Sequence, residues 1–179
     1  GATAANVIAL KGFASEVVLL DIKEGFAEGK AMDMMQTAKL FGMDTKIIGV
    51  TGDYARTAGS SVIIITSGLA RRPGMTREEL VGTNAKIVKG VMDSCLQHSP
   101  EAVFIIVSNP ADTLTYLALK DSGLPRERVI GMSGILDSSR FVYFLSQALG
   151  CNPNDIDGTV IGVHGDHMAP LARFAYYKG

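Results

Sequence analysis

Short runs of apolar residues alternate along the chain with longer segments whose apolar residues recur at helical spacing. Runs such as EVVLLDI (16–22) and SSVIIITSG (60–68) are typical of strands buried on both faces, and the longer segments of amphipathic helices. This alternation is typical of βαβ units. We therefore predict an α/β fold with a doubly wound parallel sheet. The expected strands are 16–22, 45–50, 60–68, 102–110, 128–134 and 156–167, and the expected helices are 1–14, 24–43, 75–99, 111–123, 135–150 and 171–179.

The overall charge and the length of the apolar runs argue against two classes of partner. The chain has a net charge of −1, whereas nucleic-acid-binding proteins usually have a basic excess. No apolar run approaches the roughly 20 residues of a membrane-spanning helix. The two cysteines, Cys95 and Cys151, lack CxxC spacing and favour reduced thiols in a cytoplasmic protein. We expect neither a nucleic acid nor a membrane as a partner.

Both ends of the sequence fall within helix-like segments. The first helical pattern begins at residue 1, with no preceding strand or cap to satisfy its N-terminus. We therefore expect the sequence to be an internal piece of a longer protein.

Polar residues follow several of the expected strands directly. Asp21 ends the first strand, Asn109 ends the fourth, and His164 lies in the polar turn of the last. Three arginines follow the third strand, in ITSGLARRPGMTREEL: Arg71, Arg72 and Arg77. Ligands of such sheets bind beyond the carboxyl ends of the strands, so these side chains are expected to converge on one edge.

Each of these residues also has a simpler interpretation when it is taken alone. Asp21 fits an acid that binds the ribose of a dinucleotide and favours NAD over NADP, or one that caps a helix. Asn109 fits a ligand contact or an Asn-Pro turn, and His164 a proton carrier or a solvated turn. Asp137 and Arg140, three residues apart on one helix face, fit a surface ion pair, or two separate roles in which Asp137 holds a histidine and Arg140 a substrate carboxylate. The HGDH segment lacks a third metal ligand at suitable spacing, so no metal site is expected.

Taken together, the motifs resemble those of the lactate/malate dehydrogenase family. The matching segments are GATAA, VVLLDI, ITSGLARRPGMTREEL, VSNPADT, GILDSSRF and GVHGDHM, in family order. The resemblance implies a Rossmann-type NAD-binding domain at 1–133 that lacks its N-terminal strand and first glycines. It also implies the beginning of an α+β substrate domain at 134–179, and a homodimer or homotetramer.

The resemblance implies roles for individual residues of a site that oxidises 2-hydroxy acids. His164 matches the histidine that transfers the proton, and Asp137 matches its carboxylate partner. Arg140 matches the arginine that binds the substrate carboxylate beside the reacting carbon. Arg77 matches the loop arginine that polarises the carbonyl, and Arg71 the one that contacts the far end of the substrate.

NAD is the cofactor that the resemblance implies. The matching positions for its binding are Gly1, Asp21, Asn84, Val107 and Asn109, and Asn109 also matches a substrate contact. Histidine suits the proton step because it accepts and donates protons near neutral pH, while the cofactor takes the hydride.

Arg71 favours malate and oxaloacetate as the substrate pair, because a second arginine matches the second carboxylate of a C4 acid. Lactate oxidation is the nearest alternative, since a neutral side chain at this position would favour a monocarboxylate. A non-catalytic NAD-binding module and a purely structural domain are further alternatives, but neither needs His164, Asp137 and the placed arginines. The methionine-rich helix at 24–43 fits either the core or a subunit contact.

Overall fold

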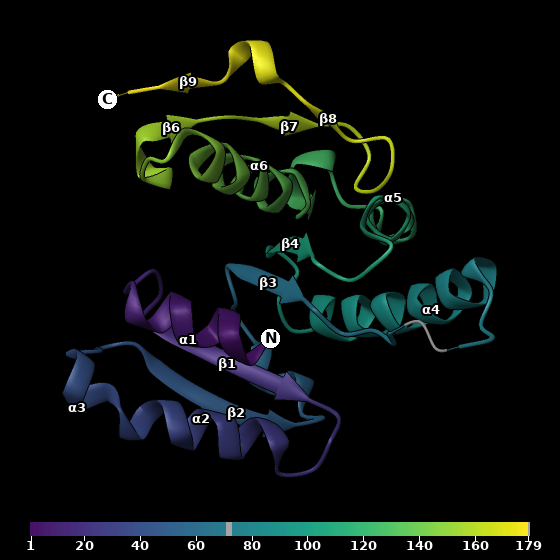
Figure 1. The fold of residues 1–179 in the computed structure, drawn as a ribbon. Coiled ribbons are helices and arrows are strands. Elements are labelled where there is room, and N and C mark those ends of the chain that lie inside the picture. Colours follow the sequence, from purple (N-terminus) through teal and green to yellow (C-terminus); the bar gives the residue numbers. More distant parts are fainter. Residues whose placement is uncertain (71–72, 179) are drawn as a thin grey trace.

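The structure is a computed structural model that describes residues 1–70 and 73–178 of the 179-residue chain. Its N-terminal part pairs two parallel strands and places helices along them (Figure 1). The strands are in register from Glu16 opposite Lys46 to Asp21 opposite Thr51. The elements of this part are α1 (Ala2–Leu10), β1 (Glu16–Asp21), α2 (Phe26–Gln36), α3 (Ala38–Phe41) and β2 (Lys46–Thr51).

A second parallel sheet follows, with the strand order β3-β4-β5. Val62 lies opposite Val103 across the first pair of strands, and Phe104 opposite Val129 across the second. Two long helices accompany this sheet and follow the carboxyl ends of β3 and β4 (Figure 1). The elements are β3 (Val62–Ile65), α4 (Arg77–Leu96), β4 (Val103–Ile106), α5 (Ala111–Ser122) and β5 (Val129–Gly131).

The parallel α/β class predicted from the alternating pattern is confirmed, but the strands form two groups rather than one continuous sheet. Within the described residues, β1 pairs only with β2, and β3 only with β4. Periodicity predicts strands from their own residues and does not specify which strands become neighbours. The side chains of Val62 and Ile64 in β3 are exposed.

The largest group of buried side chains lies between the second sheet and its helices. Phe104 and Ile106 of β4, Leu114 of α5, and Val88 and Met92 of α4 are all buried in this cluster. Burial of apolar side chains of this size contributes roughly 1.5–3 kcal/mol each to folding. The cluster fixes α4 and α5 against the strands, and so fixes the loops at the carboxyl ends of β3 and β4.

A smaller cluster joins α1 and α2 to β2 and contains Ala9, Ala31, Met43 and Ile47. Gly49 of β2 permits the close approach of α2, because a Cβ at this position would lie 2.2 Å from the main-chain oxygen of Ala27. The helix expected at 24–43 is wrong in its continuity: it is divided at Thr37 into α2 and α3. The Thr37 hydroxyl donates to the Met34 carbonyl oxygen at 2.7 Å, a local side-chain bond that competes with continuous helix.

The C-terminal part packs short antiparallel strand pairs beside one helix (Figure 1). The pairs are β6 with β9 and β7 with β8. The expected single strand at 156–167 is instead two short strands followed by a loop. The helix expected at 171–179 is also wrong, because 171–178 contains one 3₁₀ turn and then β9. The elements are α6 (Gly134–Leu149), β6 (Ile156–Asp157), β7 (Val160–Ile161), β8 (Ala169–Pro170) and β9 (Tyr176–Tyr177).

No described helix combines the length and the apolar character that crossing a membrane requires. The domain boundary expected at residue 133 falls between the end of β5 at Gly131 and the start of α6 at Gly134. This boundary stays a prediction.

Candidate active site

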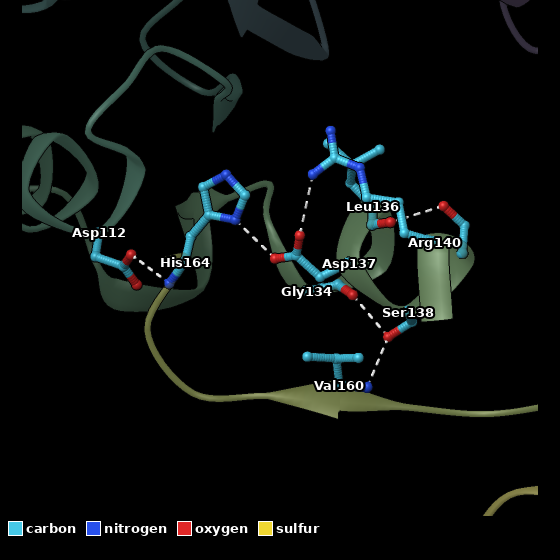
Figure 2. A network of polar contacts seen from close by, with 9 residues as sticks. Asp112, Gly134, Leu136, Asp137, Ser138, Arg140, Val160 and His164 are labelled. Atoms are coloured by element: carbon cyan, nitrogen blue, oxygen red, sulfur yellow. Dashed lines mark hydrogen bonds and ion pairs between the residues drawn. The ribbon is translucent and has the colours of Figure 1, made fainter. Parts of the chain in front are cut away.

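His164 and Asp137 are in direct contact (Figure 2). Nδ1 of His164 lies 2.6 Å from Oδ2 of Asp137. The Asp137 side chain is 3% exposed and that of His164 is 21% exposed. A short contact between an imidazole and a nearly buried carboxylate fixes the orientation of the ring. The pair predicted from residues 27 positions apart in the sequence is therefore brought together.

Helix α6 and strand β7 position this pair. Asp137 lies in the first turn of α6, and the neighbouring Ser138 faces β7. The Ser138 hydroxyl donates to the Gly134 carbonyl at 2.6 Å and accepts from the Val160 main-chain N–H at 2.9 Å (Figure 2). These bonds hold the start of β7 against α6, four residues before His164. The loop after β7 then brings the imidazole back to Asp137.

Arg140 contacts the other oxygen of the same carboxylate. Its guanidinium lies 3.3 Å from Oδ1 of Asp137, and its side chain is 59% exposed. The surface ion-pair interpretation is thus correct for the contact itself, although Asp137 is buried. Arginine has several N–H donors, so one contact to Asp137 leaves others for a further anion. Figure 2 shows the guanidinium and the imidazole at the two different oxygens of the Asp137 carboxylate.

The main chain of His164 forms a separate hydrogen bond to another helix. Its N–H donates to Oδ2 of Asp112 at 2.9 Å (Figure 2). Asp112 lies in the first turn of α5, two residues after Pro110 of the cis Asn109–Pro110 peptide. Sequence reasoning missed Asp112. Its position at a helix start was visible, but a partner 52 residues away was not.

Asn84 joins two loops at the carboxyl edge of the second sheet. Its side chain is buried, its Oδ1 accepts from Leu69 N–H at 2.8 Å, and its Nδ2 donates to the carbonyls of Leu69 and Asn109. The amide is thus bonded to the start of the arginine-containing loop and to the turn after β4. The expected cofactor contact of Asn84 stays a prediction, and the bonds present are all to main chain.

Other expected cofactor residues lie at the carboxyl ends of their strands or at a helix start. Asp21 ends β1, and its Oδ1 accepts from the Lys23 N–H at 2.9 Å. Gly1 precedes α1, and a Cβ added there would lie 3.1 Å from Oγ1 of Thr66, just after β3. Val107 is half-buried after β4, and its N–H donates to the Ile65 carbonyl at 2.9 Å. Their cofactor roles stay predictions.

Ser67 supplies an additional polar group at this edge that the sequence did not single out. Its hydroxyl is buried and has no hydrogen-bond partner among the described residues, while its carbonyl accepts from the Ser108 hydroxyl at 2.5 Å. A buried hydroxyl without a partner is costly, and such groups often mark a place where a ligand or water binds. No feature of the neighbouring residues marks it, because serine is common after strands.

The arginine loop is described only in part. Arg71 and Arg72 lie outside the described residues, so the expected contact of Arg71 is not placed. Arg77 begins α4, and its helix start is capped by Thr76 and Glu79 in a reciprocal pair of bonds. This capping box confirms the helix start predicted from MTREEL. The expected role of Arg77 at a substrate carbonyl stays a prediction.

Among residues 1–70 and 73–178, no group of three or more His, Cys, Asp and Glu side chains is arranged to hold a metal ion. The described site instead combines an imidazole, a buried carboxylate and a half-exposed guanidinium. Such a set can exchange a proton with a substrate hydroxyl and bind a substrate carboxylate.

Comparisons with known proteins find similar sequences that cover the whole chain. A family described as lactate/malate dehydrogenase, NAD binding domain, matches residues 1–131. The malate dehydrogenase of Bacteroides fragilis is 66% identical over 180 residues, covering 100% of this chain and 58% of the relative. The malate dehydrogenase of Flavobacterium frigidimaris is 62% identical with the same coverage. The chain thus spans little more than half the length of these relatives.

Solved structures of similar proteins have the same fold. The malate dehydrogenase of Salinibacter ruber has a TM-score of 0.92 at 41% identity, covering 99% of this chain and 56% of that one. A lactate dehydrogenase from Cryptosporidium parvum, complexed with lactic acid and nicotinamide adenine dinucleotide, has a TM-score of 0.91 at 40% identity, with the same coverage.

Proposed function

The chain belongs to the lactate/malate dehydrogenase family, and on this basis we propose that it is part of an NAD-dependent enzyme that interconverts malate and oxaloacetate. The observation that supports this most directly is the contact of 2.6 Å between the His164 imidazole and the buried carboxylate of Asp137. Malate oxidation removes a hydride and a hydroxyl proton from the substrate. The protein must therefore provide a base for the proton.

His164 is the proposed base. Its Nδ1 is engaged by Asp137, so the substrate proton would pass to the other ring nitrogen, Nε2. The imidazole becomes positively charged in that step, and the nearby carboxylate stabilises this charge. In the reverse reaction the imidazolium would return the proton to the oxygen of oxaloacetate. The role of Asp137 is to orient the ring and to stabilise its charged form.

Arg140 is the proposed site for the carboxylate beside the reacting carbon. Its side chain is half-exposed and its contact with Asp137 leaves N–H groups for a two-pronged bond. Arg71 would bind the second carboxylate, and Arg77 would stabilise negative charge on the carbonyl oxygen. These last two roles rest on the sequence motif. A charged bond of this type is worth on the order of 1.5–3 kcal/mol, which selects for a dicarboxylate.

The residues at the sheet edge fit NAD as the cofactor. A carboxylate at Asp21 suits the ribose hydroxyls, and the start of α1 after Gly1 suits a phosphate group. Within the part of the chain that the structure describes, the buried hydroxyl of Ser67 has no partner, which is consistent with a ligand at this edge. Val107 and Asn109 are placed in the loop after β4, and Asn84 holds that loop by its contact with Asn109. The chemistry that NAD supplies when bound is acceptance of the hydride.

The complete protein is proposed to act in the cytoplasm as a homodimer or homotetramer. The segment 24–43 supports a subunit contact, because Met32, Leu40 and Phe41 are exposed. Met43 of the same segment is buried in the core cluster. Exposed apolar side chains gathered on one helical segment are typical of interfaces. The methionine-rich segment therefore fits both interpretations, with different residues in each.

The proposed function is tested by following NADH oxidation by the complete protein with oxaloacetate and, separately, with pyruvate. We expect turnover with oxaloacetate and much slower turnover with pyruvate. We also expect His164→Asn to abolish turnover while NADH binding, followed by fluorescence titration, stays within about twofold of wild type, a difference below about 0.5 kcal/mol. Absence of turnover with oxaloacetate would refute the proposal, and turnover by the variant would remove His164 from the role of base.

A further inference from the structure

The loop that contains His164 has little regular structure to hold it in place. It connects β7 to β8, and glycines flank the histidine at Gly162 and Gly165, with φ angles of 96° and 153°. These backbone conformations are accessible mainly to glycine, which also has the largest conformational freedom in the absence of restraints. A proton-transferring side chain in such a loop needs contacts with residues outside the loop to hold it in place.

Two helices supply these contacts to two different parts of His164 (Figure 2). Asp137 of α6 holds the imidazole through Nδ1, at 2.6 Å. Asp112 of α5 holds the main-chain N–H, at 2.9 Å. The first contact sets the rotation of the ring, and the second sets the position of the backbone from which the ring extends.

We propose that Asp112 is a positioning residue for His164: its carboxylate holds the main chain of the acid/base loop against the start of α5. This inference rests on the proposed function. Asp112 lies three residues after Asn109, which is the expected contact for substrate and cofactor. The bond therefore fixes the distance between the proton-transferring loop and the turn that contains Asn109. Its place in the first turn of α5 also favours a negative charge.

The chemistry of the contact allows the hydrogen bond to be separated from the charge. Asp112→Asn keeps an oxygen that accepts from the His164 N–H and removes the charge, whereas Asp112→Ala removes both. Asp121→Ala is the matched control, because Asp121 is an exposed aspartate at the other end of α5. All variants are made in the complete protein, and each is measured for kcat, for the KM of NADH and oxaloacetate, and for amide hydrogen exchange in residues 162–168.

For Asp112→Ala we expect kcat to fall about tenfold to a hundredfold, as for loss of a hydrogen bond to a charged group. The KM for NADH should change by less than about twofold, and the His164 amide should exchange at least about tenfold faster. Asp112→Asn should recover most of both losses, and Asp121→Ala should resemble wild type. If Asp112 had a purely structural role, Asp112→Ala would lower stability without lowering kcat selectively over KM. Asp112→Asn would then not recover kcat.

Unchanged exchange of the His164 amide in Asp112→Ala would overturn the inference, and so would an equal loss of kcat in Asp112→Asn and Asp112→Ala. A wild-type protein that does not turn over oxaloacetate would instead refute the proposed function. In that case the exchange measurement still decides whether Asp112 holds His164, so the two failures are distinguishable.

Discussion

The substitution Asp137→Asn tests the proposed charge pair most directly, because it removes one charge and almost no volume. Asp137 is nearly buried, with its side chain 3% exposed, and its two oxygens contact His164 at 2.6 Å and Arg140 at 3.3 Å. The asparagine oxygen can still accept a hydrogen bond from Nδ1. The expected loss therefore reflects mainly the missing stabilisation of a positively charged imidazole.

The size of this loss follows from the separation of the two charges. Two unit charges about 4 Å apart attract by about 4 kcal/mol at an effective dielectric constant of about 20. Arg140 offsets part of the carboxylate charge, so the effect on the imidazolium is smaller than this value. Since about 1.4 kcal/mol corresponds to a factor of ten in rate, we expect kcat for malate oxidation to fall about 10²-fold.

The assay is NADH formation by the complete protein from saturating malate and NAD. Asp93→Asn is the matched control, because it removes an exposed ion pair of 2.7 Å with Lys89 on α4. Exposed pairs contribute about 0–1 kcal/mol to stability, so this variant should retain wild-type activity. A kcat for Asp137→Asn within about threefold of wild type would refute the electrostatic argument, provided that NADH binding and thermal unfolding show a folded protein.

Two further predictions concern substrate choice and pH. Arg71→Gln should lower kcat/KM for oxaloacetate and raise kcat/KM for pyruvate. The ratio of the two values should change by about tenfold to a hundredfold, because one arginine–carboxylate bond is lost. An unchanged ratio in steady-state kinetics would exclude Arg71 as the residue that selects the substrate. Burial raises the pKa of the Cys95 thiol, although a hydrogen bond to Thr57 partly opposes this. At pH values at which the Cys95 thiol ionises in the unfolded chain, the folded chain still keeps this thiol neutral. The free energy of unfolding should therefore fall as pH rises above about 8.5. Urea unfolding should show a shallower fall in Cys95→Ala, and equal slopes in the two proteins would contradict this reasoning.

The fold could be predicted from the sequence where the signal is local. Continuous apolar runs and helical periodicity identify the strands and long helices, and Thr76 with Glu79 identifies the start of α4. The division of the strands into two parallel groups was not predictable, because pairing depends on which strands are neighbours in space. The two-residue strands after α6 are too short to show periodicity. The helix expected at 171–179 is therefore wrong over the described residues of that segment.

The candidate site shows the same distinction between local and distant signals. His164, Asp137 and Arg140 belong to motifs through which the sequence resembles a family, and the structure brings them into contact; their roles stay predictions. Asp112 and Ser138 form hydrogen bonds with residues that lie 52 and 22 positions away in the sequence. Nothing in their neighbouring residues indicates those partners. A contact of this kind becomes visible only when the topology has brought the two segments together.

The positions of these contacts also indicate how the site is assembled. Asn109 and Asp112 belong to the segment after β4, whereas Asp137, Arg140 and His164 belong to α6 and the loop after β7. The contact of His164 with Asp137 lies wholly within the second group, and its contact with Asp112 joins the two groups. Separation of the groups would therefore leave the charge pair intact while moving it away from Asn109. The contact with Asp137 orients the imidazole, whereas the contact with Asp112 holds the loop against the segment of Asn109, which is why substitutions at Asp137 and Asp112 should affect the proposed reaction in different ways.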